Sequence, residues 1–334
     1  MKYGLLFHKT STNFGDDIQS YAISRFLPHI DYYIAREQID SFTSENNEPV
    51  AVIMAAWWMW KKWNWPPAEC IIPKLTSMHF NNYSVRQRST PMKNEWLTGI
   101  GKDFFDAYGP VGARDETSLE ILQKCGIDAY LSGCITLTLP EQETSEDKGK
   151  YVVLVDLKPE IKEKVLTWLD GSGLEIREFS HSIKCEGNGE NYEERLQRVE
   201  DVLTLYQNAK FVVTQRLHVT LPCIAMNVPV FSIIDLTTKR NKTRWYPYCE
   251  WVNFMTEEEI LTGDICFDNT SLAPNKQEYL QIRNDLIADI QAFISNMELL
   301  DDTTTLEELK KTDYTENEAK QWQYNQMKRV LDKW

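Results

Sequence analysis

The sequence has no paired cysteine motif and no long apolar run. Its 334 residues include seven scattered cysteines, an odd number, and none of them is spaced as Cys-x-x-Cys. This pattern argues against a disulfide framework and against a structural zinc site. No window reaches the roughly 18 apolar residues of a membrane span. The apolar start at Tyr3–Phe7 ends at His8 and Lys9, so we expect neither a signal peptide nor an integral membrane segment.

Positive charge is also scarce. The chain has 36 lysines and arginines against 50 aspartates and glutamates, which gives a formal net charge of −14. Such a field repels nucleic acid and anionic lipid over most of the surface, so nucleic acid is excluded as a partner. An anionic small molecule would need a local pocket with a few arginines. We expect a cytoplasmic protein, either soluble or peripheral at the inner face of the membrane.

Short apolar runs alternate with helical patterns, which is typical of α/β domains with parallel sheets. The length allows two domains. Residues 141–150 (EQETSEDKGK) are polar and have no periodicity. We therefore predict an N-terminal Rossmann-like domain over residues 1–140, a linker over 141–150, a second such domain over 151–300 and a helical extension over 301–334.

The expected strands are Tyr3–Phe7, Tyr32–Ala35, Val50–Met54, Pro110–Ala113, Ala129–Leu131, Tyr151–Val155, Leu174–Phe179, Phe211–Thr214 and Val228–Ile234. The expected helices are one from the Lys9–Gly15 loop to about Leu27, then Asn94–Ala107, Thr117–Cys125, Pro159–Leu169, Tyr192–Gln207, Val219–Met226, Gln277–Met297 and one from Thr315. The last helix carries an apolar stripe that must be buried. It either packs back across the domain junction or forms a contact in a homo-oligomer.

Ligands of parallel sheets bind beyond the carboxyl ends of the strands. Arg216 and His218 follow the strand Phe211–Thr214, and in an extended segment their side chains would point the same way. Arginine can bind a carboxylate or phosphate with two hydrogen bonds, and histidine exchanges a proton near neutral pH. The alternative is a histidine at a helix start and an arginine paired with a surface acid.

Two further segments follow predicted strands. Arg114 stands at a strand end, where it binds an anion or pairs with a neighbouring acid, and Asp115 is a plausible N-cap of the next helix. Residues 12–19 (TNFGDDIQ) form a glycine loop that opens a helix, although without a G-x-G-x-x-G pattern. Of Asp16 and Asp17, one is expected to cap the helix, and the other orients an acceptor hydroxyl or acts as a base.

Two weaker features are an aromatic stretch and a basic run. Residues 57–65 hold five tryptophans in nine residues, a density that suits neither a regular helix nor a strand. Tryptophan faces stack on sugars, and the alternative is a loop wedged into the domain junction. The basic residues Lys239, Arg240, Lys242 and Arg244 form either a solvated loop or a segment that overhangs the ligand site.

Together these segments resemble the polysaccharide pyruvyl transferase family. The segment 13–17 (NFGDD) is similar to the family's N-x-G-D opening, and 111–118 (VGARDETS) is similar to its G-x-R-D/E-x-x-S segment. Residues 212–218 (VVTQRLH), continued by 225–230 (AMNVPV), are similar to its R-x-H block. The matches follow the family's order over about residues 3–235. Two positions differ from many members: Val219 replaces a glycine, and 132–134 (SGC) stands where many have Asp-Pro.

The resemblance implies two facing Rossmann-like domains, as in GT-B glycosyltransferases. It also implies transfer of pyruvate from phosphoenolpyruvate to hydroxyls of a sugar or polysaccharide precursor, lipid-linked or not, to form a ketal. Neither a cofactor nor a metal is implied. The residue roles that follow are catalytic for His218, Arg216 and Asp16, donor-binding for Arg114, Arg216, Leu217 and Arg240, and acceptor-binding for Asn13, Asp17, Trp60 and Trp63.

Two other functions remain open on the sequence. A GT-B glycosyltransferase using a nucleotide sugar would share the fold, with a carboxylate beyond a strand of the second domain to bind the ribose. A non-catalytic sugar-binding relative would suit the tryptophan stretch, but it would leave Arg216 and His218 without a purpose.

Overall fold

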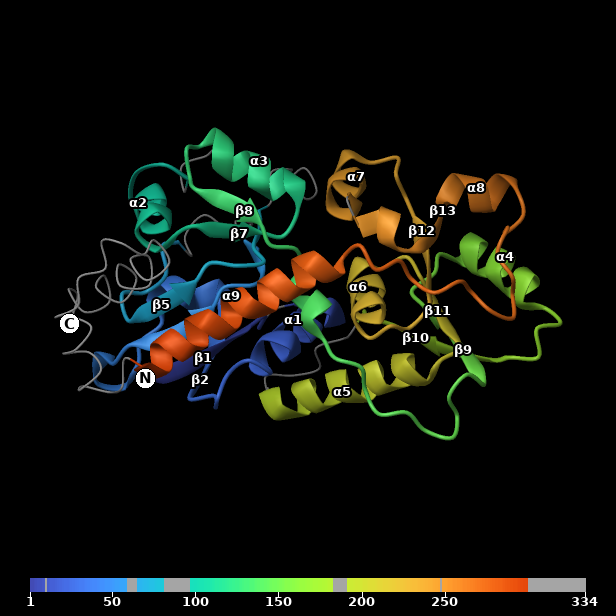
Figure 1. The fold of residues 1–334 in the computed structure, drawn as a ribbon, viewed down its shortest axis with the longest axis horizontal. Coiled ribbons are helices and arrows are strands. Elements are labelled where there is room, and N and C mark those ends of the chain that lie inside the picture. The colour runs from blue at the N-terminus through green and yellow to red at the C-terminus, as the bar shows by residue number, and fades with distance from the viewer. Residues whose placement is uncertain (10, 59–64, 81–96, 183–190, 247, 300–334) are drawn as a thin grey trace.

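The computed structural model describes residues 1–9, 11–58, 65–80, 97–182, 191–246 and 248–299 (Figure 1). Its first half contains a parallel sheet in the order β2-β1-β3-β5. The strands are β1 (Lys2–Phe7), β2 (Tyr32–Ala35), β3 (Val50–Ile53) and β5 (Ile71–Lys74). Strand β3 is buried along its whole length, as expected for a strand of a parallel sheet covered on both faces.

A second parallel sheet, in the order β10-β9-β11-β12-β13, comes entirely from the second half of the chain. Its strands are β9 (Tyr151–Val155), β10 (Glu175–Phe179), β11 (Phe211–Thr214), β12 (Val230–Ile234) and β13 (Asn253–Thr256). Among the described residues there are also two short parallel pairs: β4 (Trp57–Trp58) with β6 (His79–Phe80), and β7 (Val111–Ala113) with β8 (Ala129–Leu131).

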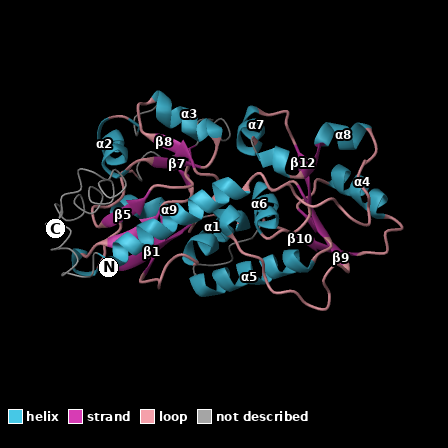
Figure 2. Cartoon of the chain, viewed as in Figure 1, coloured by secondary structure: helices cyan, strands magenta, loops and turns pink. Residues whose placement is uncertain are grey.

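Helices connect and cover the strands (Figure 2). The α-helices are α1 (Phe14–Ser24), α2 (Gly99–Tyr108), α3 (Glu116–Lys124), α4 (Pro159–Leu169), α5 (Tyr192–Asn208), α6 (Leu217–Ala225), α7 (Lys239–Trp245), α8 (Glu257–Thr262) and α9 (Leu280–Leu299). Short 3-10 helices are η1 (Arg36–Ser41), η2 (Glu45–Asn47), η4 (Ile135–Thr138) and η5 (Tyr248–Trp251).

The predicted α/β class with parallel sheets is confirmed, and most predicted elements lie within a few residues of the observed ones. Two predictions about local structure are wrong, and one strand with its following helix has no predicted counterpart. Trp57 and Trp58 form strand β4, the basic run forms helix α7, and β13 with α8 was not predicted. Strand β4 pairs with a distant strand, and such pairing is not visible in local sequence.

Three apolar clusters make up the core of the described part of the chain. One lies in the first half, around Trp58 and Phe105, and another in the second half, around Phe211 and Phe231. The largest includes residues from both halves, among them Phe14 and Ile18 of α1 with Leu217 and Leu221 of α6. Helices α1 and α6 lie side by side between the two sheets in Figure 1. This shared core fixes the ends of both helices at the junction of the two halves.

Helix α9 runs from the second half back over the first (Figure 1). Arg283 donates to the carbonyl of Ala225 at 2.9 Å and to that of Leu139 at 3.2 Å. Farther along, Asp289 accepts from Lys74 Nζ at 2.5 Å and from Tyr130 OH at 2.6 Å. Helix α9 therefore contacts both halves of the chain. The helix from Thr315, for which packing across the junction was predicted, lies outside the described residues, and its packing stays a prediction. No helix in the described part of the chain could span a membrane.

Because Lys74 is buried and Asp289 is only partly exposed, their ion pair should stabilise the seating of α9. We expect Asp289→Asn to lower the free energy of unfolding by about 1–3 kcal/mol, since it removes the charge that both donors share. Asp285→Asn, at an exposed position of the same helix, should change it by less than about 0.5 kcal/mol. Urea denaturation of both variants checks this, and equal midpoints would show that Asp289 has no such role.

Candidate functional site

Asn13 shapes the loop that opens helix α1. Its backbone is extended, and its side-chain oxygen accepts from the N–H of Gly15 at 3.3 Å. Asn13 is therefore the N-cap, and the prediction that Asp16 or Asp17 would be the cap is wrong. Both aspartates stand inside the first turn of the helix, where they are buried against other side chains.

Asp16 is the acceptor of a dense set of hydrogen bonds. It accepts from Ser11 Oγ at 2.5 Å, from Gln19 Nε2 at 3.2 Å and from Asn13 Nδ2 at 3.3 Å. Burial alone would raise its pKa, but His8, the positive charge of Arg36 and the bond from Ser11 outweigh burial and lower the pKa. Asp16 is thus held as a carboxylate, the form that a base or an orienting group requires.

Asp17 points to the second half of the chain. Its carboxylate forms a two-pronged ion pair with Arg195 of α5, with the Nε contact at 3.2 Å. Burial raises its pKa, and the charge of Arg195 acts in the opposite direction. Arg195 also donates to the carbonyl of His8 at 3.3 Å. In this structure Asp17 joins α1 to α5, so its predicted contact with an acceptor would have to share the carboxylate with Arg195.

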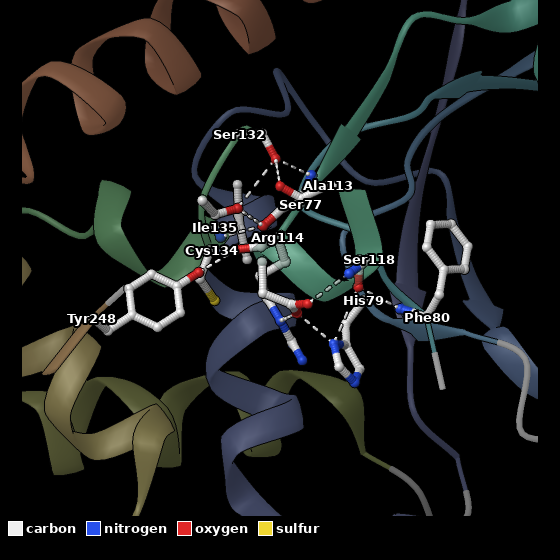
Figure 3. A network of polar contacts seen from close by, with 12 residues as sticks. Ser77, His79, Phe80, Ala113, Arg114, Ser118, Ser132, Cys134, Ile135 and Tyr248 are labelled. Atoms are coloured by element: carbon white, nitrogen blue, oxygen red, sulfur yellow. Dashed lines mark hydrogen bonds and ion pairs between the residues drawn. The ribbon is translucent and has the colours of Figure 1, made fainter. Parts of the chain in front are cut away.

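Arg114 follows β7 and is almost fully buried, with 2% of its surface exposed. Figure 3 shows it between Tyr248 on one side and His79 with Ser118 on the other. Its Nη1 donates to Gln19 of α1 at 3.2 Å, and its carbonyl accepts from Tyr248 OH. Asp115 caps α3 as predicted, accepting from the N–H of Ser118 at 2.9 Å. The guanidinium is thereby placed against the first turns of α1.

His218 lies in the first turn of α6, between the two halves, with 7% of its surface exposed. It packs on α1 so closely that a Cβ added at Gly15 would lie 2.7 Å from its Cβ, so only glycine fits there. Its Nε2 is 3.9 Å from Cys134 Sγ. Burial, and next the positive charge of Arg114, hold its pKa well below 6.5, while Asp16 acts in the opposite direction.

Arg216 does not share the orientation of His218. It is the N-cap of α6, and the helix begins at Leu217, so the extended segment that would align the two side chains is absent. Its side chain is 45% exposed and pairs with Asp156 at 2.9 Å. Burial lowers the pKa of His181 to about 3; Asp156 acts in the opposite direction, and the charge of Arg216 adds a smaller lowering effect. The prediction that Arg216 and His218 point the same way is wrong.

The remaining predicted residues divide into two groups. Leu217 is buried in the shared core and contributes packing in this structure. Arg240 belongs to the first turn of α7, and its side chain is outside the described residues, as are Trp60 and Trp63 entirely. Their predicted roles stay predictions.

The sequence analysis missed a buried His–Asp pair. His79 Nδ1 lies 2.5 Å from Asp115 Oδ2, and the ring also approaches Ser118 Oγ at 3.4 Å (Figure 3). Burial lowers the pKa of His79 to about 4, and Asp115 acts in the opposite direction. The pair could not be predicted from the sequence, because no sequence pattern links position 79 to position 115.

A second missed histidine lies at the topological switch point of the first sheet. Strand β1 has β2 on one side and β3 on the other, and ligands of such sheets bind where the order reverses. His8 follows β1 there and is fully buried, and among the described residues neither ring nitrogen has a hydrogen-bond partner. Burial, and then the charge of Arg36, lower its pKa to about 4.

The site therefore combines a carboxylate, a buried arginine and neutral histidines at the junction of α1, α6 and β7. Within the described residues, no group of three His, Cys, Asp or Glu side chains is placed to hold a metal ion. The arrangement suits proton transfer to and from a bound anion, since Arg114 supplies fixed positive charge beside His218 and Asp16.

One comparison with known proteins identifies a family. Residues 13–235 match the family model described as polysaccharide pyruvyl transferase. A search of curated proteins finds no match. Among solved structures, a functionally uncharacterized protein of Klebsiella pneumoniae is 13% identical, with a TM-score of 0.43 over 76% of this chain and 93% of that one. The Escherichia coli heptosyltransferase WaaC with ADP is 14% identical, with a TM-score of 0.28 over 86% of this chain and 100% of that one. TM-scores of this size carry no argument about fold.

Proposed function

This chain belongs to the polysaccharide pyruvyl transferase family, and on that premise we propose that it transfers a pyruvyl group from phosphoenolpyruvate to two hydroxyls of a sugar. The acceptor would be part of a polysaccharide or of its precursor, and the product a ketal. We further propose that residues 1–140 and 151–300 form two Rossmann-like domains of the GT-B kind, with the site between them.

One observation carries the proposal: the buried position of His218 beside Arg114 and Asp16. His218 is neutral in the free protein, because burial and Arg114 both disfavour its charged form. A donor that brings a phosphate and a carboxylate would reverse this, since nearby negative charge raises the pKa of an imidazole. His218 would then be protonated when the donor is bound, which is when a general acid is needed.

The chemistry uses this proton directly. His218 would protonate the methylene carbon of phosphoenolpyruvate, which makes the neighbouring carbon electrophilic. The first sugar hydroxyl attacks that carbon, and its proton restores His218. The second hydroxyl replaces phosphate as the carbon–oxygen bond to phosphate breaks, and its proton leaves with the phosphate. Asp16 would orient the attacking hydroxyl, and a positioned acid of this kind contributes about 10²–10⁴-fold. No metal or cofactor takes part in the proposed reaction.

Phosphoenolpyruvate should stabilise the protein against heat, by about 2.7 kcal/mol at a hundredfold excess over its dissociation constant. We expect Arg114→Lys to weaken this ligand-induced shift, because lysine keeps the charge but cannot form the two-pronged bond. Arg216→Lys should also weaken it if Arg216 leaves Asp156 for the donor. The measurement is a thermal-shift titration in which each variant is compared with its own ligand-free state.

Nucleotide sugars serve as the control ligands in the same titration. Stabilisation by a nucleotide sugar without stabilisation by phosphoenolpyruvate would replace the proposed reaction with glycosyl transfer. An unchanged shift in Arg114→Lys would remove Arg114 from the donor site.

A further inference from the structure

Helix α7 carries an arginine of the second half onto an aromatic ring of the first. The guanidinium carbon of Arg244 lies 5.6 Å from the ring centroid of Trp57 in β4. The Trp57 ring in turn meets the ring of His79 edge-on, with centroids 5.2 Å apart. A cation above an indole is held by the ring quadrupole, so this contact fixes the guanidinium at the junction.

The same part of the chain is tied to Arg114. Tyr248, which follows α7 in η5, is buried and donates its hydroxyl to the Arg114 carbonyl, as Figure 3 shows. Helices α7 and α3 are also in contact. Because Asp115 of the His79 pair is the neighbour of Arg114, the two arginines flank the His79–Asp115 pair.

Both arginines act on the same imidazole. Burial is the largest cause that lowers the pKa of His218 and of His79. Arg114 and Arg244 lower both pKa values further, while Asp16 opposes this for His218 and Asp115 opposes it for His79. Asp16 and Asp115 are the nearby carboxylates, and each accepts hydrogen bonds of its own. In a chain with a net charge of −14, two arginines on either side of the His79–Asp115 pair, Arg244 through Trp57 and Arg114 next to Asp115, form a local site for an anion.

We infer that Arg244 is a further arginine of the donor site and binds the phosphate, while Arg114 binds the carboxylate. This assignment rests on the proposed function for the identity of the donor. Arg114 is buried, whereas Arg244 is partly exposed. Phosphate is the group that must leave, so it belongs at the more exposed arginine, and the carboxylate stays with the product at the inner one.

The experiment compares three ligands, namely phosphoenolpyruvate, inorganic phosphate and pyruvate, by isothermal titration calorimetry. Arg244→Gln should weaken phosphate and phosphoenolpyruvate binding by about 10–100-fold, the loss of a charge-assisted pair, and leave pyruvate binding unchanged. Lys242→Gln, at an exposed position of the same helix, should change none of the three. Arg244→Lys keeps the positive charge and a cation next to Trp57, so its phosphate affinity should lie between that of the parent protein and that of Arg244→Gln. This variant serves as the control for a folding defect.

Three results would overturn the inference. Unchanged phosphate affinity in Arg244→Gln, or no phosphate binding by the parent protein, would leave Arg244 as a packing contact on Trp57. Equal losses for pyruvate and phosphate would show that it does not select the phosphate. Phosphate binding that depends on Arg244 without any binding of phosphoenolpyruvate would keep the anion site and reject the proposed donor.

Discussion

His218→Ala is expected to lower turnover by about 10²–10⁴-fold while changing donor affinity by only a few-fold. The proposed reaction cannot begin until the methylene carbon is protonated. His218 is the imidazole whose pKa is set by burial and then by the charges of Arg114 and Asp16. Donor binding should change little because the arginines supply the attraction for the anion. Steady-state kinetics with phosphoenolpyruvate, together with calorimetric donor affinity, measure the two effects separately.

His218→Gln is the matched variant, because glutamine keeps a hydrogen-bond donor but cannot transfer a proton near neutral pH. It should be as slow as the alanine variant. If glutamine supported near-normal turnover, His218 would only position the donor, and the proton would come from another group. Cys134→Ser tests the thiol 3.9 Å away in the same assay and should retain most of the turnover, since it is not needed for either proton step.

The fold was largely predictable because its information is local. The strand Tyr32–Ala35 and the helix Pro159–Leu169 were predicted with the observed limits, since each combines a clear apolar pattern with a clear start or end. Strand β4 was not, because Trp57 and Trp58 owe their extended form to pairing with His79 and Phe80. Helix α7 was missed because its charged residues have no apolar period. Its start depends on the N-cap Thr238, whose hydroxyl accepts a hydrogen bond from the N–H of Asn241 at 3.2 Å.

The site was predictable in its parts and not in their orientation. Arg114, Asp16 and His218 were singled out because they follow strand ends, and the structure brings them together. Arg216 was expected beside His218, but helix α6 begins two residues earlier than predicted, and Arg216 pairs with Asp156. The contacts of His79 and Arg244 join segments that are distant in sequence. Such pairs follow from tertiary packing, which no local pattern encodes.

Acidification should destabilise the protein well above the range in which carboxylates titrate, and His8 is a main cause. Burial and Arg36 lower its folded pKa to about 4, from 6.5 when unfolded, while Asp16 and Glu37 oppose this and Arg195 adds to it. The unfolded chain therefore binds more protons between pH 6.5 and 4. Stability is fully present above pH 6.5 and falls with pH through that window. For one histidine the slope is about 1.4 kcal/mol per pH unit, and the total loss is about 3 kcal/mol.

The measurement is urea unfolding of the protein and of His8→Phe at a series of pH values from 7.5 to 4. His8→Phe removes the titrating group. Between pH 6.5 and 4, the slope of its free energy of unfolding against pH should therefore be smaller than that of the parent protein by about 1.4 kcal/mol per pH unit. Above pH 6.5 the two slopes should coincide, which serves as the internal control for any constant cost of the larger side chain. Parallel curves over the whole range would mean that His8 is protonated equally in both states. Its buried ring nitrogens would then have a partner that stabilises the imidazolium, and the assignment of a neutral state to His8 in the folded protein would be wrong.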